Sequence, residues 1–304
     1  MIEKFFFDLT SLPEKKELSL TLGNFDGFHL GHQELAFQAF SNSSKENAIF
    51  LFSSPYKTYF HNEPMLTDLH QRLVYAEQNR FESAYILSSS EEVFGMSKEE
   101  FEELLRVLGV KEIFVGEDYR YGKGALGTPD TLIEAGFKVR IVPLLVDNGE
   151  KIASSKIKSH IAKGEMEEAA RLMGRPYEIS GKVIEGKQIG RTLGFPTANL
   201  GLDFPYMIPL FGAYAGRAFV RGVPHLSMIS VGMNPTFANT KTPSIEAHIL
   251  DFDEDIYGET ITVSFYHLLR PSLRFESKEK LIAQLKEDEE NTREYFLSLK
   301  EEVE

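Results

Sequence analysis

Alternation between short β-type runs and helical patterns constrains the fold of this chain more than any other feature. The β-type runs cover 18–22, 48–52, 84–87, 112–115 and 138–144, and helix-like stretches lie near 31–41, 67–80, 97–107 and 129–135. Such alternation is typical of a parallel sheet that is covered by helices. The spacing of Ser97 and Glu100 predicts a capping box, and Thr67 or Asp68 is expected to open the preceding helix.

The pattern changes after Gly174-Arg175-Pro176, where glycine can close a helix and proline cannot continue one. Beyond this point, β-rich pieces separated by glycine and proline loops indicate a small barrel, at 177–186, 212–220, 225–232, 244–251 and 260–267. Since 304 residues exceed what one hydrophobic core usually organises, we predict two domains, 1–176 and 177–304. The charged segment 277–304 is expected to form a helix that packs on the barrel.

The charge of the chain limits its partners. With 33 basic and 46 acidic side chains the net charge is -13, which repels long polyanions, so we expect no nucleic-acid partner. A small phosphorylated ligand stays compatible with this charge, because oriented backbone amides bind anions locally. The chain has no cysteine, which excludes disulfides and thiol nucleophiles. It has neither a signal-peptide pattern nor a membrane-length apolar run, so we expect a cytoplasmic protein with no membrane partner.

The run 18–23 reads as a buried strand that turns, through 24–27, into a helix near Leu30. The first amides of a helix are unpaired and favour an anion, so this turn is a candidate phosphate site. His29 and His32 would lie about one helical turn apart on one face, and Gly31 leaves room for a ligand near the backbone. A zinc pair and two incidental histidines are the alternatives, although no Glu or His follows at the spacing of a zinc-protease helix.

A second candidate site follows the strand that starts at 177. Gly186 and Gly190 allow backbone amides to approach phosphates, but no Gly-Lys-Ser/Thr closes the loop as in a P-loop. Thr197 and Asn199 offer neutral oxygens at alternating positions, which suit magnesium that already carries phosphate ligands. The alternative is that Thr197 and Asn199 only cap a turn, and that Glu246 is simply a solvent-facing strand residue.

The stretch Gly23-Asn-Phe-Asp-Gly-Phe-His-Leu-Gly-His32 resembles the phosphate-binding signature of His-x-x-His nucleotidyltransferases, in the form found in bacterial FAD synthetases. The stretch 115–122 resembles the second loop of that family. The resemblance implies that the FMN phosphate attacks the α-phosphorus of ATP and pyrophosphate leaves. It implies catalytic roles for His29 and His32 and ATP contacts for the remaining positions of the family pattern: Asn24, Phe25, Gly31, Ser154, Ser155 and Lys158.

Two positions differ from the family pattern. Phe52-Ser-Ser-Pro-Tyr56 stands where Phe-x-Pro-His-Pro is usual, and Lys158 stands where arginine is usual. Lysine keeps the positive charge but lacks the fork that binds a phosphate with two parallel hydrogen bonds.

The stretch Gly190-Arg-Thr-Leu-Gly-Phe-Pro-Thr-Ala-Asn199 closely resembles the signature of riboflavin kinases, and 231–237 and 245–251 match two further motifs in order. The resemblance implies a six-stranded barrel in which Thr197 and Asn199 bind Mg²⁺ with ATP and Glu246 accepts the proton of the flavin ribityl hydroxyl. Further implied contacts are Gly186, Gly190 and Arg191 for ATP and Asn234, Arg270 and Phe275 for flavin. Ser272 replaces an acidic residue that is usual in the family.

Together these features predict an α/β Rossmann-like nucleotidyltransferase domain followed by a six-stranded antiparallel β-barrel of the riboflavin kinase type with a C-terminal helix. We expect riboflavin, FMN and ATP as substrates, Mg²⁺ as cofactor, and a monomer or weak homo-oligomer. Two alternatives stay open: a riboflavin kinase with a weakened adenylyltransferase domain, and a flavin- or nucleotide-binding regulator without turnover.

Overall fold

The computed structural model describes residues 1–186, 189–233 and 243–301 and divides into two compact units. The N-terminal unit is Met1–Ser154 and the C-terminal unit is Ser155–Glu304. The boundary predicted from the sequence, between 176 and 177, comes later in the chain than this division and follows helix α8 (Met166–Met173). It stays a prediction for the limits of the functional domains. Within the part of the chain that the structure describes, no helix is long and apolar enough to span a membrane.

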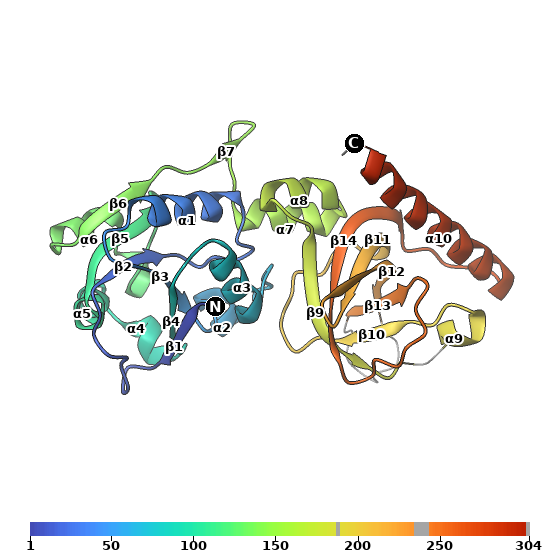
Figure 1. Ribbon diagram of the computed structural model, residues 1–304, viewed down its shortest axis with the longest axis horizontal. Coiled ribbons are helices and arrows are strands. Elements are labelled where there is room, and N and C mark those ends of the chain that lie inside the picture. Colours follow the sequence, from blue (N-terminus) through green and yellow to red (C-terminus); the bar gives the residue numbers. More distant parts are fainter. Residues whose placement is uncertain (187–188, 234–242, 302–304) are drawn as a thin grey trace. The chain divides into compact units, whose positions relative to one another are not determined.

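The N-terminal unit is built on a parallel six-stranded sheet with the order β1-β4-β3-β2-β5-β6 (Figure 1). Its strands are β1 (Glu3–Phe7), β2 (Leu18–Leu22), β3 (Glu46–Phe52), β4 (Ser83–Leu87), β5 (Val110–Gly116) and β6 (Lys138–Val142). Every residue of β2 and β4 is buried, as expected for strands that are covered on both faces. The predicted parallel sheet is therefore confirmed.

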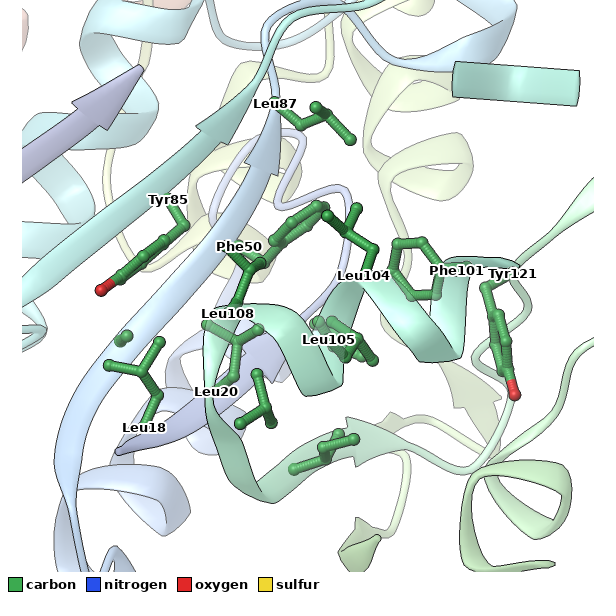
Figure 2. Packing of buried hydrophobic residues seen from close by; sticks show 14 of the residues in the cluster. Leu18, Leu20, Phe50, Tyr85, Leu87, Phe101, Leu104, Leu105, Leu108 and Tyr121 are labelled. Atoms are coloured by element: carbon green, nitrogen blue, oxygen red, sulfur yellow. The ribbon is translucent and has the colours of Figure 1, made fainter. Parts of the chain in front are cut away.

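Helices cover the two faces of this sheet. The helical segments of the unit are α1 (Leu30–Asn42), α2 (Tyr56–His61), α3 (Leu69–Gln78), α4 (Glu91–Gly95), α5 (Lys98–Leu108), the 3₁₀ turn η1 (Lys123–Ala125) and α6 (Pro129–Glu134), of which α2 and η1 have no buried residue. Side chains of α4, α5 and α6 share one apolar cluster with Leu20 and Phe50, whereas α1 and α3 pack with Ile49 in a second cluster. Figure 2 shows the α5 side chains beside those of β2, β3 and β4. Successive residues of β3 thus point to opposite faces of the sheet and pack in two different apolar clusters.

Helix starts follow the predicted capping chemistry. The Ser97 hydroxyl accepts from the Glu100 amide at 3.1 Å, and the Glu100 carboxylate accepts from the Ser97 amide at 2.7 Å, which confirms the capping box of α5. Asp68 caps α3 in the same way with Gln71. A short hairpin, β7 (Val146–Asp147) and β8 (Glu150–Lys151), follows the sheet.

The C-terminal unit contains a closed antiparallel barrel with the strand order β10-β13-β12-β11-β14-β9, which confirms the predicted six-stranded barrel. Its strands are β9 (Tyr177–Ile184), β10 (Ala198–Gly201), β11 (Gly212–Val220), β12 (Val223–Met233), β13 (Pro243–Ile249) and β14 (Thr260–Pro271). Helix α7 (Ser154–Lys163) starts at the unit boundary, and α9 (Ile189–Leu193) lies between β9 and β10 in the sequence. Gly174, which has a left-handed backbone, caps the C-terminus of α8.

The predicted C-terminal helix is α10 (Lys278–Glu301), which packs on β11, β12 and β14. Phe296 is its buried apolar anchor, with its ring 4.9 Å from that of Tyr266 on β14. A bidentate ion pair between Arg270 and Asp288 also joins β14 to the helix.

Candidate functional sites

The histidine turn, residues 23–29, connects β2 to α1 at the carboxyl end of the sheet. His29 is the N-cap residue of α1 and has an extended backbone, so the chain changes direction just before the helix. Phe25, Gly27 and Phe28 all have positive φ angles, of 51°, 80° and 39°. The resulting turn places the N-terminus of α1, where amides lack helical partners, at the point predicted to bind phosphate.

The two histidines lie against each other. Their ring centroids are 3.8 Å apart with an interplanar angle of 22°, so the predicted proximity of His29 and His32 is present in the structure. A Cβ added at Gly31 would come within 3.3 Å of the His29 ring. Glycine at this position therefore leaves space for the His29 ring. Among the described residues no group of three or more His, Asp or Glu side chains is placed to hold a metal ion, so a zinc pair lacks further ligands of these types.

The predicted nucleotide contacts near the turn differ in exposure. Asn24 is exposed, whereas Phe25 is fully buried and its ring stacks 5.4 Å from that of Phe28. Any contact of Phe25 with a nucleotide would therefore come from its backbone. Ser154, the first residue of α7, donates to the Asp26 carbonyl oxygen at 2.8 Å, and Ser155 and Lys158 follow in the same helix.

Sequence reasoning missed the segment that supports the turn. The Asp26 carboxylate accepts from the amides of Leu66 and Thr67 at 2.7 and 3.3 Å, and the Gly27 amide donates to the Thr67 hydroxyl at 2.8 Å. Asp26 and Thr67 are both buried. Only the expectation that Thr67 or Asp68 opens a helix pointed to an ordered structure here.

At the departure from the family pattern, Tyr56 begins α2 and is half exposed. Its ring lies 4.8 Å from that of Phe60 and 5.4 Å from that of Phe94. The position that lacks the expected histidine is thus part of an aromatic cluster.

The second candidate site lies on adjacent strands of the barrel. Asn199 on β10 is directly opposite Glu246 on β13, and the Thr197 hydroxyl donates to the Glu246 carboxylate at 3.2 Å. These three half-buried side chains alternate with buried residues such as Ala198 and Ala247, so they share the more open face of the pair. The structure therefore brings together the predicted magnesium ligands and the predicted base.

Two glycines make this arrangement possible. A Cβ at Gly186 would lie 2.6 Å from Cγ of Asn199, and one at Gly190 would overlap the carbonyl oxygen of Phe195. The loop after β9 therefore packs directly on the segment that carries Thr197 and Asn199. The side chain of Arg191 and the whole of Asn234 lie outside the described residues.

His248 is a further neighbour that sequence reasoning missed. Its Nδ1 lies 2.7 Å from the Pro196 carbonyl oxygen, and its ring meets that of Phe195 edge-on at 5.3 Å. Because His248 is two residues after Glu246 on β13, one strand positions both the carboxylate and the turn before Thr197.

Arg270 and Phe275, the described members of the predicted flavin-binding set, are neighbours: the guanidinium lies 5.5 Å from the Phe275 ring centroid. Arg270 also binds Asp288, whose side chain is only 2% exposed, so much of its hydrogen-bonding capacity is used inside the unit. Phe275 lines an open cavity of about 460 Å³ between α9 and the start of α10, together with Thr192, Leu193, Ser277, Lys278 and Leu281.

Comparison with known proteins identifies relatives of both units. A family model described as FAD synthetase matches residues 11–156, and one described as riboflavin kinase matches residues 173–296. The chain is 36% identical over 293 residues to the bifunctional riboflavin kinase/FMN adenylyltransferase of Listeria monocytogenes, covering 93% of each chain. It is 32% identical to the Bacillus subtilis protein of the same name, covering 94% of this chain and 95% of that one.

A solved structure is similar over nearly the whole chain. The crystal structure of a protein from Streptococcus pneumoniae, described as a macrolide-efflux protein, matches with a TM-score of 0.84 and 30% identity. The match covers 95% of this chain and 99% of that one.

Proposed function

The chain belongs to the family of bifunctional riboflavin kinase/FMN adenylyltransferases, and from this premise we propose which residues carry each of its two activities. It is an enzyme of flavin cofactor biosynthesis, with one unit related to riboflavin kinases and the other to FAD synthetases. The proposal assigns phosphorylation of riboflavin to the C-terminal unit and adenylylation of FMN to the N-terminal unit.

In the C-terminal unit, Glu246 accepts the proton of the ribityl hydroxyl while that oxygen attacks the γ-phosphorus of ATP. The bond from the γ-phosphorus to its bridging oxygen breaks, and FMN and ADP result. The single observation that supports this best is the hydrogen bond of 3.2 Å from Thr197 to Glu246, on strands where Glu246 faces Asn199. This bond orients the carboxylate, and it leaves the lone pairs of the Thr197 oxygen available for other contacts.

The oxygen atoms of Thr197, Asn199 and Glu246 form a set that fits Mg²⁺, which prefers oxygen ligands and keeps phosphate oxygens in its shell. We propose that Thr197 and Asn199 hold the ion. When bound, it neutralises negative charge on the ATP phosphates. The loop through Gly186 and Gly190 packs against this segment and is proposed to approach the phosphates. The cavity lined by Phe275 is proposed for the flavin, and Arg270 contacts the Phe275 ring.

In the N-terminal unit, a phosphate oxygen of FMN attacks the α-phosphorus of ATP, the bond between the α- and β-phosphates breaks, and FAD and pyrophosphate result. Such a reaction depends on positioning and charge stabilisation rather than on a covalent intermediate. The stacked pair of His29 and His32 at the start of α1 supports this assignment, and Asn24 is exposed in the turn that precedes it. Roles for Ser154, Ser155 and Lys158 in binding the leaving pyrophosphate stay predictions.

Two incubations test the proposal. Riboflavin, ATP and Mg²⁺ are expected to give FMN, and FMN, ATP and Mg²⁺ are expected to give FAD and pyrophosphate. FMN without any FAD would favour a kinase with an inactive adenylyltransferase unit, the alternative suggested by Tyr56 and Lys158. Binding of flavin without any consumption of ATP would favour a regulator instead. The need for magnesium, a cytoplasmic location and a monomeric or weakly oligomeric state belong to the same proposal.

A further inference from the structure

The histidine turn has a backbone that does not hold its shape by itself. Phe25 and Phe28 are non-glycine residues at φ 51° and 39°, a region that is unfavourable for a bulky side chain. Such conformations persist only where the surroundings enforce them. Side chains that hold this turn therefore determine where the histidines at its end are placed.

Arg72 is a buried side chain that contacts this turn from α3. It lies on α3, one turn after the N-cap Asp68, and it is 0% exposed. Its Nη1 donates to the carbonyl oxygens of Asn24 and Phe52, at 3.5 and 3.2 Å, and its Nη2 donates to that of Ser53 at 3.3 Å. One guanidinium thus joins the histidine turn after β2 to the loop after the adjacent strand β3.

A fully buried cation needs a structural reason. Burial lowers the pKa of Arg72 to about 10, against the opposing effect of the Asp26 and Asp68 carboxylates, so the group still carries its charge at neutral pH. Placing such a charge among backbone carbonyls is costly unless its donors are satisfied. The two terminal nitrogens of Arg72 bind carbonyls of chain segments about 48 and 20 residues earlier in the sequence, whereas its buried Nε has no hydrogen-bond partner among the described residues. Removing the guanidinium would leave these carbonyls without that donor.

The start of α3 holds the same turn from a second point. Leu66 and Thr67 bind the Asp26 carboxylate, and the Thr67 hydroxyl binds the Gly27 amide. The capping box of Asp68 and Gln71 fixes the direction in which α3 leaves this contact, and hence the place of Arg72 one turn later. The turn is therefore attached to α3 both before and after the cap.

We infer that Arg72 is a positioning residue of the N-terminal unit, which fixes the histidine turn 23–29 relative to the loop 52–54 so that His29 and His32 are correctly placed for adenylyl transfer. Its effect on rate rests on the proposed function, whereas its effect on the histidine positions does not. The role needs the planar guanidinium of arginine, because Nη1 binds carbonyls of both segments while Nη2 holds the Ser53 carbonyl. A lysine ammonium at the end of a flexible chain lacks the second nitrogen and the fixed plane that set these directions.

The test compares Arg72→Met and Arg72→Lys with the wild type in the full chain. Histidine side chains are labelled with ¹³C, and the signals of His29 and His32 are assigned by Asn substitution among the eight histidines. We expect both signals to shift in both variants. The kcat of FAD formation should fall about 100-fold in Arg72→Met and about tenfold in Arg72→Lys, since a displacement of about 1 Å can cost two orders of magnitude. The KM for ATP should change less than kcat, and FMN formation should not change.

The control for simple destabilisation is Leu105→Ala, in the cluster on the other face of the sheet (Figure 2). It should lower the unfolding midpoint without moving the two histidine signals. Wild-type signals and wild-type kcat in Arg72→Lys would overturn the inference, even if Arg72→Met fails to fold. Equal shifts in Leu105→Ala would overturn it as well. If the wild type makes no FAD, the proposed adenylyl transfer fails, and the histidine signals still decide whether Arg72 positions the turn.

Discussion

Replacement of Glu246 by glutamine separates the proposed chemical role of this residue from its structural one. Glutamine keeps the length of the side chain and an oxygen that can accept the hydrogen bond now donated by Thr197 at 3.2 Å. It cannot take up the proton of the ribityl hydroxyl. General-base catalysis contributes about 10²- to 10⁴-fold to a rate, so the kcat of FMN formation should fall by that factor, or about 3–5 kcal/mol of activation free energy.

The expected loss of stability is much smaller. Glu246 is half-buried, and the change replaces a hydrogen bond to a charged acceptor by one to a neutral acceptor, which costs about 1 kcal/mol or less. A large loss of rate with a small loss of stability is therefore the signature of the base, whereas comparable losses would indicate that the carboxylate mainly holds the strands together.

The assay measures FMN at saturating riboflavin, ATP and Mg²⁺ over a range of pH, with urea unfolding of each variant in parallel. Ser230→Ala is the matched control, because Ser230 on β12 lies directly opposite Glu246 on its other side and its loss leaves the carboxylate in place. We expect this control to keep kcat within about twofold, as surface substitutions usually have small effects. A kcat of Glu246→Gln within tenfold of the wild type would refute the role of Glu246 as base.

Four further predictions address the rest of the molecule. His29→Ala should reduce FAD formation while FMN formation continues, as measured by separation of the two products; equal loss of both would contradict separate sites. Asp288→Asn should destabilise the C-terminal unit by about 3–5 kcal/mol in urea unfolding, because it leaves the mostly buried Arg270 without its ion pair, and an unchanged midpoint would count against this. Burial alone would raise the pKa of Glu112, but hydrogen bonds from Lys138 and Arg140 outweigh it and lower the pKa to about 2, below the ordinary 4.5. The Glu112 carboxylate therefore takes up a proton more readily in the unfolded chain than in the folded one. About 3 kcal/mol of stability that is present above pH 4.5 should be lost as the pH falls towards 2. Glu112→Gln should remove that part of the pH dependence of unfolding. Chelation of Mg²⁺ by EDTA should stop FMN formation, with recovery when excess Mg²⁺ is added; persistent activity would argue against the metal role of Thr197 and Asn199.

The sheet was predictable wherever its strands are buried on both faces. Strand β2, Leu18-Ser-Leu-Thr-Leu22, alternates leucine with small polar residues, and this period of two could be recognised without knowing its neighbours. Strand β1 could not, because Glu3–Phe7 lies at the edge of the sheet, has exposed positions, and pairs with residues 80 positions later. Strand β10 has only four residues and follows Pro196, so it was recognisable only from its pairing with β9 and β13. Strands β1 and β10 thus owe their structure to partners that a local pattern does not show, whereas the other edge strand, β6, was recognised from its own sequence within the run 138–144.

The site residues also fall into those that the sequence indicated and those that it did not. His29, His32, Thr197 and Asn199 stand in compact motifs, and the structure brings the members of each pair onto neighbouring positions. Glu246 is 47 residues beyond Asn199, yet the strand register places the two opposite each other. The roles of the supporting residues could not be assigned from the sequence, even for Asp26 and His248, which stand inside matched stretches, because their partners are backbone atoms and any residue supplies a carbonyl oxygen. They are Asp26, Thr67, Arg72 and His248.

The two sites are supported differently, and this determines which substitutions each site tolerates. In the N-terminal unit the histidine turn has an unfavourable backbone, and buried side chains such as Asp26 and Arg72 hold it, so the loss of a hydrogen-bonding group is the damaging change. In the C-terminal unit the loop after β9 fits on Asn199 because Gly186 has no Cβ, so the addition of a single carbon is the damaging change. The two motifs that suggest a nucleotide site are thus stabilised by opposite means, and for the histidine turn those means lie mostly outside the motif itself.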